Sequence, residues 1–207
     1  PKPAGDKSPY FDIEKKYGVE IDFKPLIKVE GLTLQEIRAQ RVEVKDYTAI
    51  VFTARVAIDN FFRLCEEMRY TVPDTMKYFC VSEKIASYLQ KYIQYRKRKV
   101  FFPAVETNKV EELLPQIKRH SDEKYLVAVA DVSKDSFVEV LEKLNIKCAK
   151  AAFYKTVSAD IAEGKEFDYD MVTFFSPEGI HSLTKNYPNF EQGNVVIAAL
   201  GAKTAKA

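Results

Sequence analysis

The sequence predicts an α/β fold in which two similar parallel-sheet units are joined by two extended segments that form a two-stranded β-ladder hinge. Three observations predict this fold class. Apolar strand-like segments alternate with amphipathic helix-like ones, one strand-turn-helix pattern occurs twice, and extended stretches at 19–29 and 147–157 bracket one of the two copies. Regular alternation of strand and helix favours a parallel sheet covered on both faces, with binding loops at the carboxyl ends of its strands.

The pattern that occurs twice is an apolar strand running directly into a helix, which we call an elbow. In the copy at 168–180 the β-branched and aromatic residues predict a buried strand, Ser176 is placed to cap the helix, and Pro177 fits its first position. The free N–H groups of such a first turn make an elbow a ready anion site. The matching elbow at 46–58 lies at a constant offset of 122, with Ala54 in the place of Ser176.

A second pair of related segments follows the two elbows. Residues 78–86 resemble residues 197–205, again as a strand, a short turn and a helix. Because both pairs recur in the same order, the chain is expected to contain two copies of one α/β unit.

The other elements are placed by capping signals and hydrophobic spacing. Ser8 begins a helix that stops at Gly18, and Thr33 with Glu36 forms a capping box. Strands are expected at 77–82, 99–102 and 125–130, and helices at 55–68, 83–94, 108–119 and 133–144. In the first of these helices the apolar residues recur at helical spacing and are expected in the core: Ile58, Phe61, Phe62, Cys65 and Met68.

The order of the elements predicts a discontinuous domain organisation. Residues 34–146 form an inserted α/β domain, and the segments 22–33 and 147–158 carry the chain into it and back out as hinge linkers. Residues 1–21 and 159–207 then share an outer α/β domain. Since a loop at the start stands where a first strand would be, we expect this outer domain to lack that strand.

Composition and charge set limits on the protein class. The chain has 207 residues, 46% hydrophobic and 30% charged, enough for one large core or two small ones. It has no 18-residue apolar run and no apolar leader, and its net charge is +2. We therefore expect no membrane or nucleic-acid partner. Cys65, Cys80 and Cys148 are odd in number and set among apolar residues, as expected of reduced core residues in a cytoplasmic protein.

Common catalytic signatures are absent from the sequence. It contains no Walker loop, Gly-x-Gly-x-x-Gly, His-Glu-x-x-His or Gly-x-Ser-x-Gly. His120 lies in a charged helix end and is expected to be a solvated surface residue. His181 lies in the first turn of the second elbow helix, where it faces either a ligand or water. The basic run at 96–99 has no aromatic stacking platform around it and is expected to be a solvated edge.

Three motifs together resemble the uroporphyrinogen-III synthase family. They are Phe-Phe-Ser-Pro-Glu-Gly-Ile at 174–180, Ala-Leu-Gly-Ala-Lys-Thr-Ala at 199–205 and Ala-Phe-Tyr-Lys-Thr-Val at 152–157. Weaker copies at 52–54 and 81–86 fall where the family has its own first-half motifs. The resemblance covers nearly the whole chain, and each motif alone would be modest evidence.

This resemblance implies both a reaction and a substrate. The family closes hydroxymethylbilane, a linear tetrapyrrole with eight carboxylates, into uroporphyrinogen III with loss of water and inversion of the last pyrrole ring. It is a lyase activity that needs no metal or organic cofactor. The resemblance implies a cleft between two α/β domains in which helix starts hold the carboxylates. We expect the protein to work as a monomer.

The resemblance also assigns roles to residues. Tyr154 matches a tyrosine whose phenol is proposed to assist the leaving hydroxyl, although a half-buried strand tyrosine would look the same. The residues expected to bind substrate lie at the starts of four helices, two in the elbows and two in the second pair of related segments. They are Thr53, Ala54, Arg55, Ser82, Ser176, Pro177, Gly179, Gly201, Lys203 and Thr204.

The sequence also departs from the family pattern. Ala54 replaces a usual serine, Ser82 a usual glycine, Ile85 a usual threonine, and Lys203 the first of two adjacent threonines. Backbone N–H groups would survive these changes. The family continues through more helix and strand after the last motif, so we expect the outer domain to lack its C-terminal end as well.

A different class of protein also fits this organisation. Two α/β lobes on a two-stranded hinge describe sensor modules that close on a small molecule without chemistry. Tyr154 and the Ser-Pro-x-Gly elbow favour the synthase, and the replaced first-half residues favour the binding module.

Overall fold

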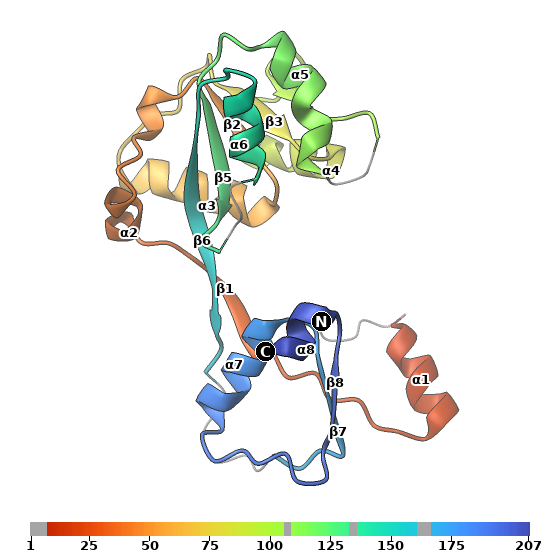
Figure 1. Cartoon of the computed structure of the whole chain (residues 1–207). Helices are drawn as coiled ribbons and strands as arrows, with labels where there is room; N and C mark the ends of the chain where they lie inside the picture. Colours follow the sequence, from red (N-terminus) through yellow and green to blue (C-terminus); the bar gives the residue numbers. More distant parts are fainter. Residues whose placement is uncertain (1–7, 106–108, 133–135, 161–166) are drawn as a thin grey trace. The chain divides into compact units, whose positions relative to one another are not determined.

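The computed structural model describes residues 8–105, 109–132, 136–160 and 167–207. The chain divides into two compact units, which we call unit 1 (Pro1–Val29 with Thr156–Ala207) and unit 2 (Glu30–Lys155). Figure 1 shows the elements of each. The divisions fall inside the two segments that the sequence predicts as linkers. The predicted opening loop at 1–7 lies outside the described residues.

Unit 2 is built around a mainly parallel sheet whose strand order is β1-β6-β5-β2-β3-β4. The strands are β1 (Ile27–Gly31), β2 (Ala49–Phe52), β3 (Lys77–Cys80), β4 (Val100–Phe101), β5 (Tyr125–Ala130) and β6 (Cys148–Ser158). The pairs from β6 through β5, β2 and β3 to β4 are all parallel. β2 is buried at every position, as expected of a strand covered on both faces. The predicted α/β class with a parallel sheet is confirmed.

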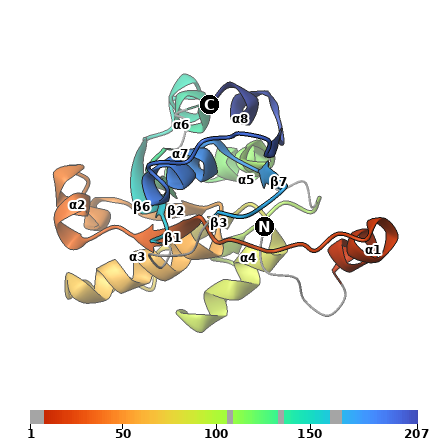
Figure 2. The ribbon, with the colours of Figure 1, turned by 90° about the horizontal axis from the view of Figure 1, so that it is seen from below.

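Helices cover both faces of this sheet. Figure 2 shows α5 and α6 on one face and α3 and α4 on the other. The helices of unit 2 are α2 (Leu34–Ala39), α3 (Arg55–Glu67), α4 (Glu83–Tyr88), α5 (Leu114–Arg119) and α6 (Ser136–Lys143), with 3₁₀ turns at Val44–Asp46, Leu89–Lys91 and Val110–Leu113. In α3 the predicted core stripe is confirmed, because Ile58, Phe61 and Cys65 are buried.

Two predicted helices differ from the structure in length and type. The helix expected to reach residue 94 ends at Tyr88 and continues as a 3₁₀ turn. The helix expected at 108–119 begins as a 3₁₀ turn and becomes α-helical at Leu114. Pro115 explains the change, since it has no N–H to donate to an earlier turn. Residues 108 and 133–135 of the predicted helices lie outside the described residues.

Aromatic side chains fill the core of unit 2. Phe61 of α3 packs edge-on against Phe52 of β2 at 5.6 Å and against Phe153 of β6 at 5.7 Å between ring centroids. The three cysteines are free, and Cys65 and Cys80 are fully buried here. Cys148 is only half-buried at the margin of the core, so its predicted core position is wrong. Burial raises the pKa of the Cys65 thiol to about 12, so it stays protonated, as the sequence predicts for inert core residues.

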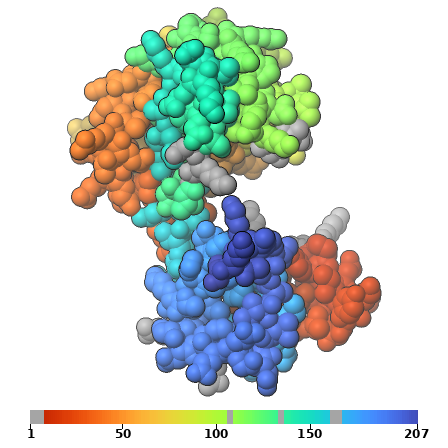
Figure 3. Space-filling view, in the orientation of Figure 1, coloured from red at the N-terminus to blue at the C-terminus, as the bar shows by residue number. Residues whose placement is uncertain are grey.

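Unit 1 consists of smaller elements. They are α1 (Pro9–Tyr17), β7 (Met171–Phe174), α7 (Pro177–Asn186), β8 (Val196–Ala199) and α8 (Ala202–Lys206), and β7 pairs with β8 in parallel. The predicted ends of α1 are confirmed, because Ser8 accepts a hydrogen bond from the N–H of Tyr10 at 3.3 Å and Gly18 has a φ of 64°. In the space-filling view α1 forms a separate red lobe beside the blue part of the unit (Figure 3).

The prediction that the strand of the second elbow is buried is wrong. Of the four residues of β7 only Phe174 is buried, whereas Met171 is 54% exposed and the following Phe175 is 43% exposed. β8 is likewise open, with Val196 57% exposed. Among the described residues β7 pairs with β8 alone, so the remaining edge and much of the sheet surface have no neighbour to cover them.

The predicted internal duplication is confirmed residue by residue. β2 begins at Ala49 and β7 at Met171, and α3 and α7 begin at Arg55 and Pro177, so both pairs lie 122 positions apart. In unit 2 the elbow strand β2 pairs in parallel with β3, and in unit 1 the elbow strand β7 pairs in parallel with β8. The repeated unit is therefore a parallel β-α-β-α element.

Candidate functional site

The carboxyl edge of the unit 2 sheet gathers several of the predicted site residues. Thr53 follows β2 directly, Ser82 follows β3 closely, and Tyr154 on β6 pairs with Ala130 at the end of β5. Because carboxyl ends of parallel strands meet at one edge, these residues lie in a row where ligands bind in such sheets. Thr53 and Tyr154 lie close enough for the Thr53 side chain, as a hydrogen-bond partner, to lower the pKa of the phenol.

A small pocket opens beside Thr53 and Tyr154. Its volume is about 190 Å³, and most of its walls are apolar. It lies on the sheet face that α6 covers and is lined by Thr53, Val110, Val127, Val129, Ala130, Phe137, Val138, Lys150 and Tyr154. A phenol at the mouth of an apolar pocket is partly withdrawn from water. Burial accordingly raises the pKa of Tyr154, and the Thr53 hydrogen bond offsets part of the rise, so the phenol remains a proton donor at neutral pH.

The backbone that carries Tyr154 is held by α2 and the residues beside it. The side chain of Gln40 pairs with Ala152 like a neighbouring strand: its Nε2 donates to the carbonyl oxygen at 2.9 Å, and its Oε1 accepts from the N–H at 2.8 Å. The N–H of Leu32 donates to the carbonyl oxygen of Phe153 at 3.0 Å. These contacts flank the register shift in β6, opposite Val129 and Ala130, that sets the direction of Tyr154.

An ion pair completes this support on the other side of Tyr154. Nζ of Lys155 lies 2.6 Å from a carboxylate oxygen of Glu36, and the other oxygen of that carboxylate accepts from the N–H of Thr33 at 2.8 Å. The contact with Lys155 and, to a smaller extent, the hydrogen bonds from Thr33 lower the pKa of Glu36 to about 2. We call Leu32, Glu36 and Gln40, with their partners on β6, the α2 clamp.

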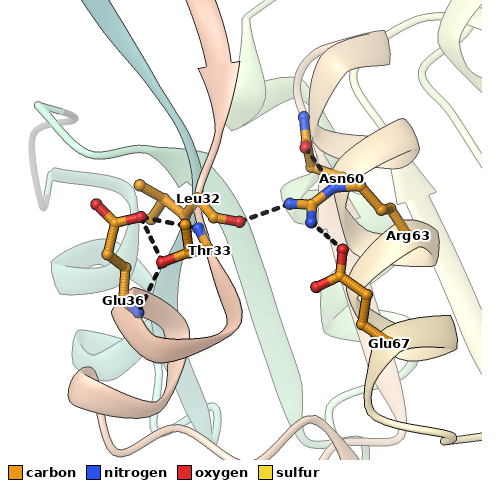
Figure 4. A network of polar contacts seen from close by, with 6 residues as sticks. All are labelled: Leu32, Thr33, Glu36, Asn60, Arg63 and Glu67. Atoms are coloured by element: carbon orange, nitrogen blue, oxygen red, sulfur yellow. Dashed lines mark hydrogen bonds and ion pairs between the residues drawn. The ribbon is translucent and has the colours of Figure 1, made fainter.

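The α2 clamp is itself fastened to α3. Figure 4 shows the capping box of Thr33 and Glu36 beside Arg63, which reaches from α3. Nη2 of Arg63 donates to the carbonyl oxygen of Leu32 at 2.5 Å, and its Nη1 lies 2.5 Å from a carboxylate oxygen of Glu67. The helix that follows the first elbow therefore fixes the segment that supports Tyr154.

Arg55 stands at the first position of α3, next to Ala54. The side chain of the N-cap residue Ala54 cannot accept a hydrogen bond, so no capping side chain occupies the N–H groups of the first turn. The guanidinium of Arg55 lies 5.3 Å from the centre of the Tyr88 ring, and the Tyr88 hydroxyl donates to Asp59 at 2.9 Å. Arg55 is exposed and is thus placed on an aromatic platform at the elbow.

The second helix start of unit 2 is more enclosed. Ser82 is buried and occupies the N-cap position of α4 without a side-chain capping bond. Ile85, where the family usually has a threonine, is buried in the core. The side chain of Ile85 is therefore used for packing.

The elbow of unit 1 places its residues as the sequence predicts, with one exception. Pro177 is the first residue of α7, and Ser176 has the extended φ of −155° and ψ of 158° of an N-cap residue. The predicted cap is wrong, however, because the Ser176 side chain makes no capping hydrogen bond. A Cβ atom built on Gly179 would lie 3.4 Å from Cδ1 of Phe174.

The last predicted residues follow β8, the parallel neighbour of β7. Gly201 has a φ of 92°, which an L side chain rarely adopts, and Lys203 is exposed. Thr204 is buried, so its side chain packs inside unit 1. These residues and the elbow of α7 share one edge of the two-stranded sheet.

The structure therefore gathers the predicted residues in two sets, one within each unit. In unit 2, Thr53 and Tyr154 are in direct contact. Sequence reasoning missed Gln40, which lies 112 positions from its partner, and Lys150, which lines the pocket. Strand alternation from Tyr154 could have pointed to Lys150, because the two are an even number of residues apart.

Neither histidine joins these sets. His181 is exposed on α7. The prediction of a solvated His120 is wrong, since its ring is half-buried and packs 4.6 Å from that of Phe101. Within the ranges that the structure describes, no group of three or more His, Cys, Asp or Glu residues is arranged to hold a metal ion. In the same ranges, no helix has the length and apolar character to span a membrane.

A strand-helix connection that occurs twice in each of two units, with polar residues at the carboxyl ends of the strands, defines a duplicated parallel α/β protein. The family model of uroporphyrinogen-III synthase HemD matches residues 12–207. The chain belongs to the uroporphyrinogen-III synthase family, a family of enzymes in tetrapyrrole and haem biosynthesis, and the resemblance found in its sequence is confirmed.

Solved structures agree at the level of the fold. A mutant uroporphyrinogen III synthase from Thermus thermophilus aligns with a TM-score of 0.55 and 13% identity over 95% of this chain and 82% of that one. Uroporphyrinogen-III synthetase from Helicobacter pylori aligns with a TM-score of 0.54 and 18% identity over 87% of this chain and 78% of that one. No curated protein matches the chain by sequence.

Proposed function

We propose that the chain is a lyase that closes hydroxymethylbilane into uroporphyrinogen III, with loss of water and inversion of the last pyrrole ring. Membership of the synthase family supports the reaction. The observation that carries the proposal for this chain is that Tyr154 and Thr53 together line an apolar pocket at the carboxyl edge of a parallel sheet.

The first step assigned to this pair is departure of the terminal hydroxyl. The C–O bond breaks as the phenol of Tyr154 donates a proton to the oxygen, which leaves as water, and the electron pair of the pyrrole nitrogen forms the azafulvenium cation, whose charge the phenolate balances. Thr53 lies beside the phenol and lowers its pKa, which favours transfer of the phenol proton to the leaving group.

The carboxylates of the substrate are assigned to the helix starts. In α3 and α7 the N-cap side chains of Ala54 and Ser176 leave the first-turn N–H groups to a ligand, and Arg55 adds a charge. Ser82, Pro177, Gly179, Gly201, Lys203 and Thr204 complete the proposed set. For the buried side chains of Ser82 and Thr204, any such contact is made by the backbone.

The remaining parts of the proposal concern organisation and setting. We place an inserted domain at 34–146, an outer domain at 1–21 with 159–207, and hinge linkers at 22–33 and 147–158. The protein acts as a monomer without nucleic-acid or membrane partners and without a cofactor. Its three free cysteines support a reducing, cytoplasmic compartment.

One experiment tests the reaction. The protein is incubated with enzymatically generated hydroxymethylbilane, and the uroporphyrin isomers are separated after oxidation. Because the substrate closes spontaneously to the type I isomer, we expect the protein to give mainly type III, faster than the spontaneous reaction. Formation of type I alone at the spontaneous rate, with substrate bound, would indicate a binding module and contradict the proposal.

A further inference from the structure

The pocket beside Tyr154 contains a charge that the proposed reaction has not used. Lys150 lies on β6 four residues before Tyr154, and both line the pocket. Among the described residues that line it, Lys150 is the one with a charged side chain. It pairs in register with Val127, another lining residue, whereas Phe153 points to the opposite face and packs against Phe61.

The size of the pocket limits what can enter it. Sites for drug-sized ligands measure roughly 300–1,000 Å³, and this pocket measures about 190 Å³. A linear chain of four pyrrole rings is far too large for it. A single flat ring is not, and the side chains of Val127, Val129 and Phe137 offer apolar surface to the faces of such a ring.

The charge of the substrate adds a second condition. Eight carboxylates on four rings give two for each ring, and an ionised carboxylate is strongly disfavoured in an apolar pocket unless it is paired. A ring can therefore enter between these walls only where a cation meets one of its carboxylates. The flexible stem of Lys150 can lie along the apolar wall while its ammonium reaches that carboxylate.

We propose that this pocket is a subsite for one pyrrole ring, with Lys150 paired to a carboxylate of that ring and the Tyr154 phenol at the other end. The inference rests on the proposed function, because it takes hydroxymethylbilane as the substrate. Four residues along a strand separate Cα atoms by about 13 Å, so ammonium and phenol can contact opposite ends of one substituted ring. Lys150 already interacts with another group in the free protein, and the carboxylate would exchange one partner for another.

The subsite can be tested with a single ring. The probe is a monopyrrole carrying one acetate and one propionate side chain, titrated into the isotopically labelled full chain and followed by NMR. A dialkyl pyrrole without carboxylates is the matched ligand. We expect the acidic pyrrole to bind, and to shift signals of Val127, Val129 and Phe137 most.

Three variants isolate the charge. Lys150→Met keeps an apolar stem and removes the ammonium, Lys150→Arg keeps the charge, and Lys147→Met removes an exposed lysine three residues earlier. We expect Lys150→Met to weaken binding of the acidic pyrrole by about tenfold to a hundredfold, the usual worth of a hydrogen bond to a charged group. Lys150→Arg should recover most of the affinity, and Lys147→Met should match the wild type.

Several outcomes would overturn the subsite. They are no binding of the acidic pyrrole to wild type, equal binding to Lys150→Met, equal binding of the uncharged pyrrole, or shifts confined to other surfaces. If Lys150→Met fails to fold, the ligand comparison on wild type and Lys150→Arg still decides. The isomer assay separates the two proposals: type III product without Lys150-dependent binding defeats the subsite alone, and absence of type III product defeats the proposed function.

Discussion

Units 1 and 2 contain the same elbow but bury it differently. β2 in unit 2 is buried at all four positions, whereas the equivalent β7 in unit 1 buries Phe174 and exposes Met171. β2 has β5 on one side and β3 on the other. β7 has β8 on one side, and among the described residues no strand on the other. A wide sheet with helices on both faces encloses β2 (Figure 2), whereas β7 belongs to a two-stranded sheet, so the surroundings of the strand and not its apolar pattern decide the burial.

The local geometry of the elbow is nevertheless the same in both units. Ala54 has φ −149° and ψ 152°, and Ser176 has φ −155° and ψ 158°. Ser82 repeats these values closely, at −155° and 160°. Three of the four strand-helix connections thus reach one conformation without a side-chain cap, whereas Gly201 before α8 has a φ of 92°. What differs between the units is how strongly the surroundings stabilise it.

The largest expected effect compares two equivalent phenylalanines. Phe52→Ala in unit 2 removes a ring that packs against Phe61 and Tyr78, and it should destabilise the unit by about 3–5 kcal/mol through lost burial and a cavity. Phe174→Ala, 122 positions later, should cost only about 1.5–3 kcal/mol, because an open surrounding can collapse and leaves little cavity. Urea unfolding, with hydrogen exchange to assign each unit, measures both.

Equal losses at the two positions would contradict this comparison. A larger loss for Phe174→Ala would mean that unit 1 carries more of the stability than its exposed sheet indicates. Either result would separate burial of the strand from its contribution to the free energy of unfolding.

The next effect tests whether unit 2 holds the chemistry. Tyr154→Phe removes one hydroxyl and keeps the ring, and it should lower turnover by about tenfold to a thousandfold, the usual range for a positioned proton donor. The residual product should still be type III, since the walls that hold the substrate are unchanged. Steady-state kinetics with isomer separation measures both quantities.

The matched control for Tyr154 is a tyrosine of unit 1. Tyr169→Phe removes a hydroxyl that donates to Asp22 at 2.6 Å, away from the proposed site residues, and should leave turnover unchanged. A wild-type rate in Tyr154→Phe would exclude this phenol from the reaction. A change to type I product at a good rate would show that the phenol controls inversion.

Sequence reasoning succeeded where a feature is local. The elbows, the position of Pro177 and the capping box of Thr33 with Glu36 depend on residues within a few positions of one another, and the structure has all of them. Gly18 likewise ends α1 in the left-handed conformation that glycine permits.

Sequence reasoning failed where a feature depends on a contact between residues that are distant in the sequence. The pairing of Gln40 with Ala152 and the exposure of β7 depend on which segments the fold brings together, and no local pattern contains that information. Ser176 shows a second reason. Its type and position suit a cap, but a cap bond also depends on the side-chain rotamer, which the sequence does not specify.

A smaller effect compares the third helical residue of the two elbows. The first elbow has buried Ala57 where the second has Gly179. Gly179→Ala should stabilise α7 by about 0.5–1 kcal/mol, because alanine is the better helix former and its Cβ would reach only the edge of ordinary contact with Phe174 at 3.4 Å. If substrate approaches this turn, KM for hydroxymethylbilane should rise by about tenfold.

The two readouts for Gly179→Ala distinguish its roles. Higher thermal stability with raised KM fits a glycine kept for ligand approach. Higher stability with unchanged KM would remove this elbow from the carboxylate site, and lower stability would show that Phe174 cannot yield to the added methyl group.

The smallest effect concerns the electrostatic part of the α2 clamp, which unit 2 uses to hold the Tyr154 strand. Lys155 and Thr33 lower the folded pKa of Glu36 from 4.5 to about 2. A depressed carboxyl pKa adds stability that is present above the unfolded value and is lost as pH falls toward the folded value.

Glu36→Gln should therefore be less stable than wild type at pH 7, by a small amount because the pair is exposed. The difference should shrink below a pH of about 4.5 and vanish near a pH of about 2, the two pKa values of this carboxyl. Urea unfolding across this range measures it, with Glu43→Gln, an exposed carboxylate of the same unit, as the control for net charge. A difference that stays constant over the whole range would assign the effect to the uncharged hydrogen bonds of the capping box.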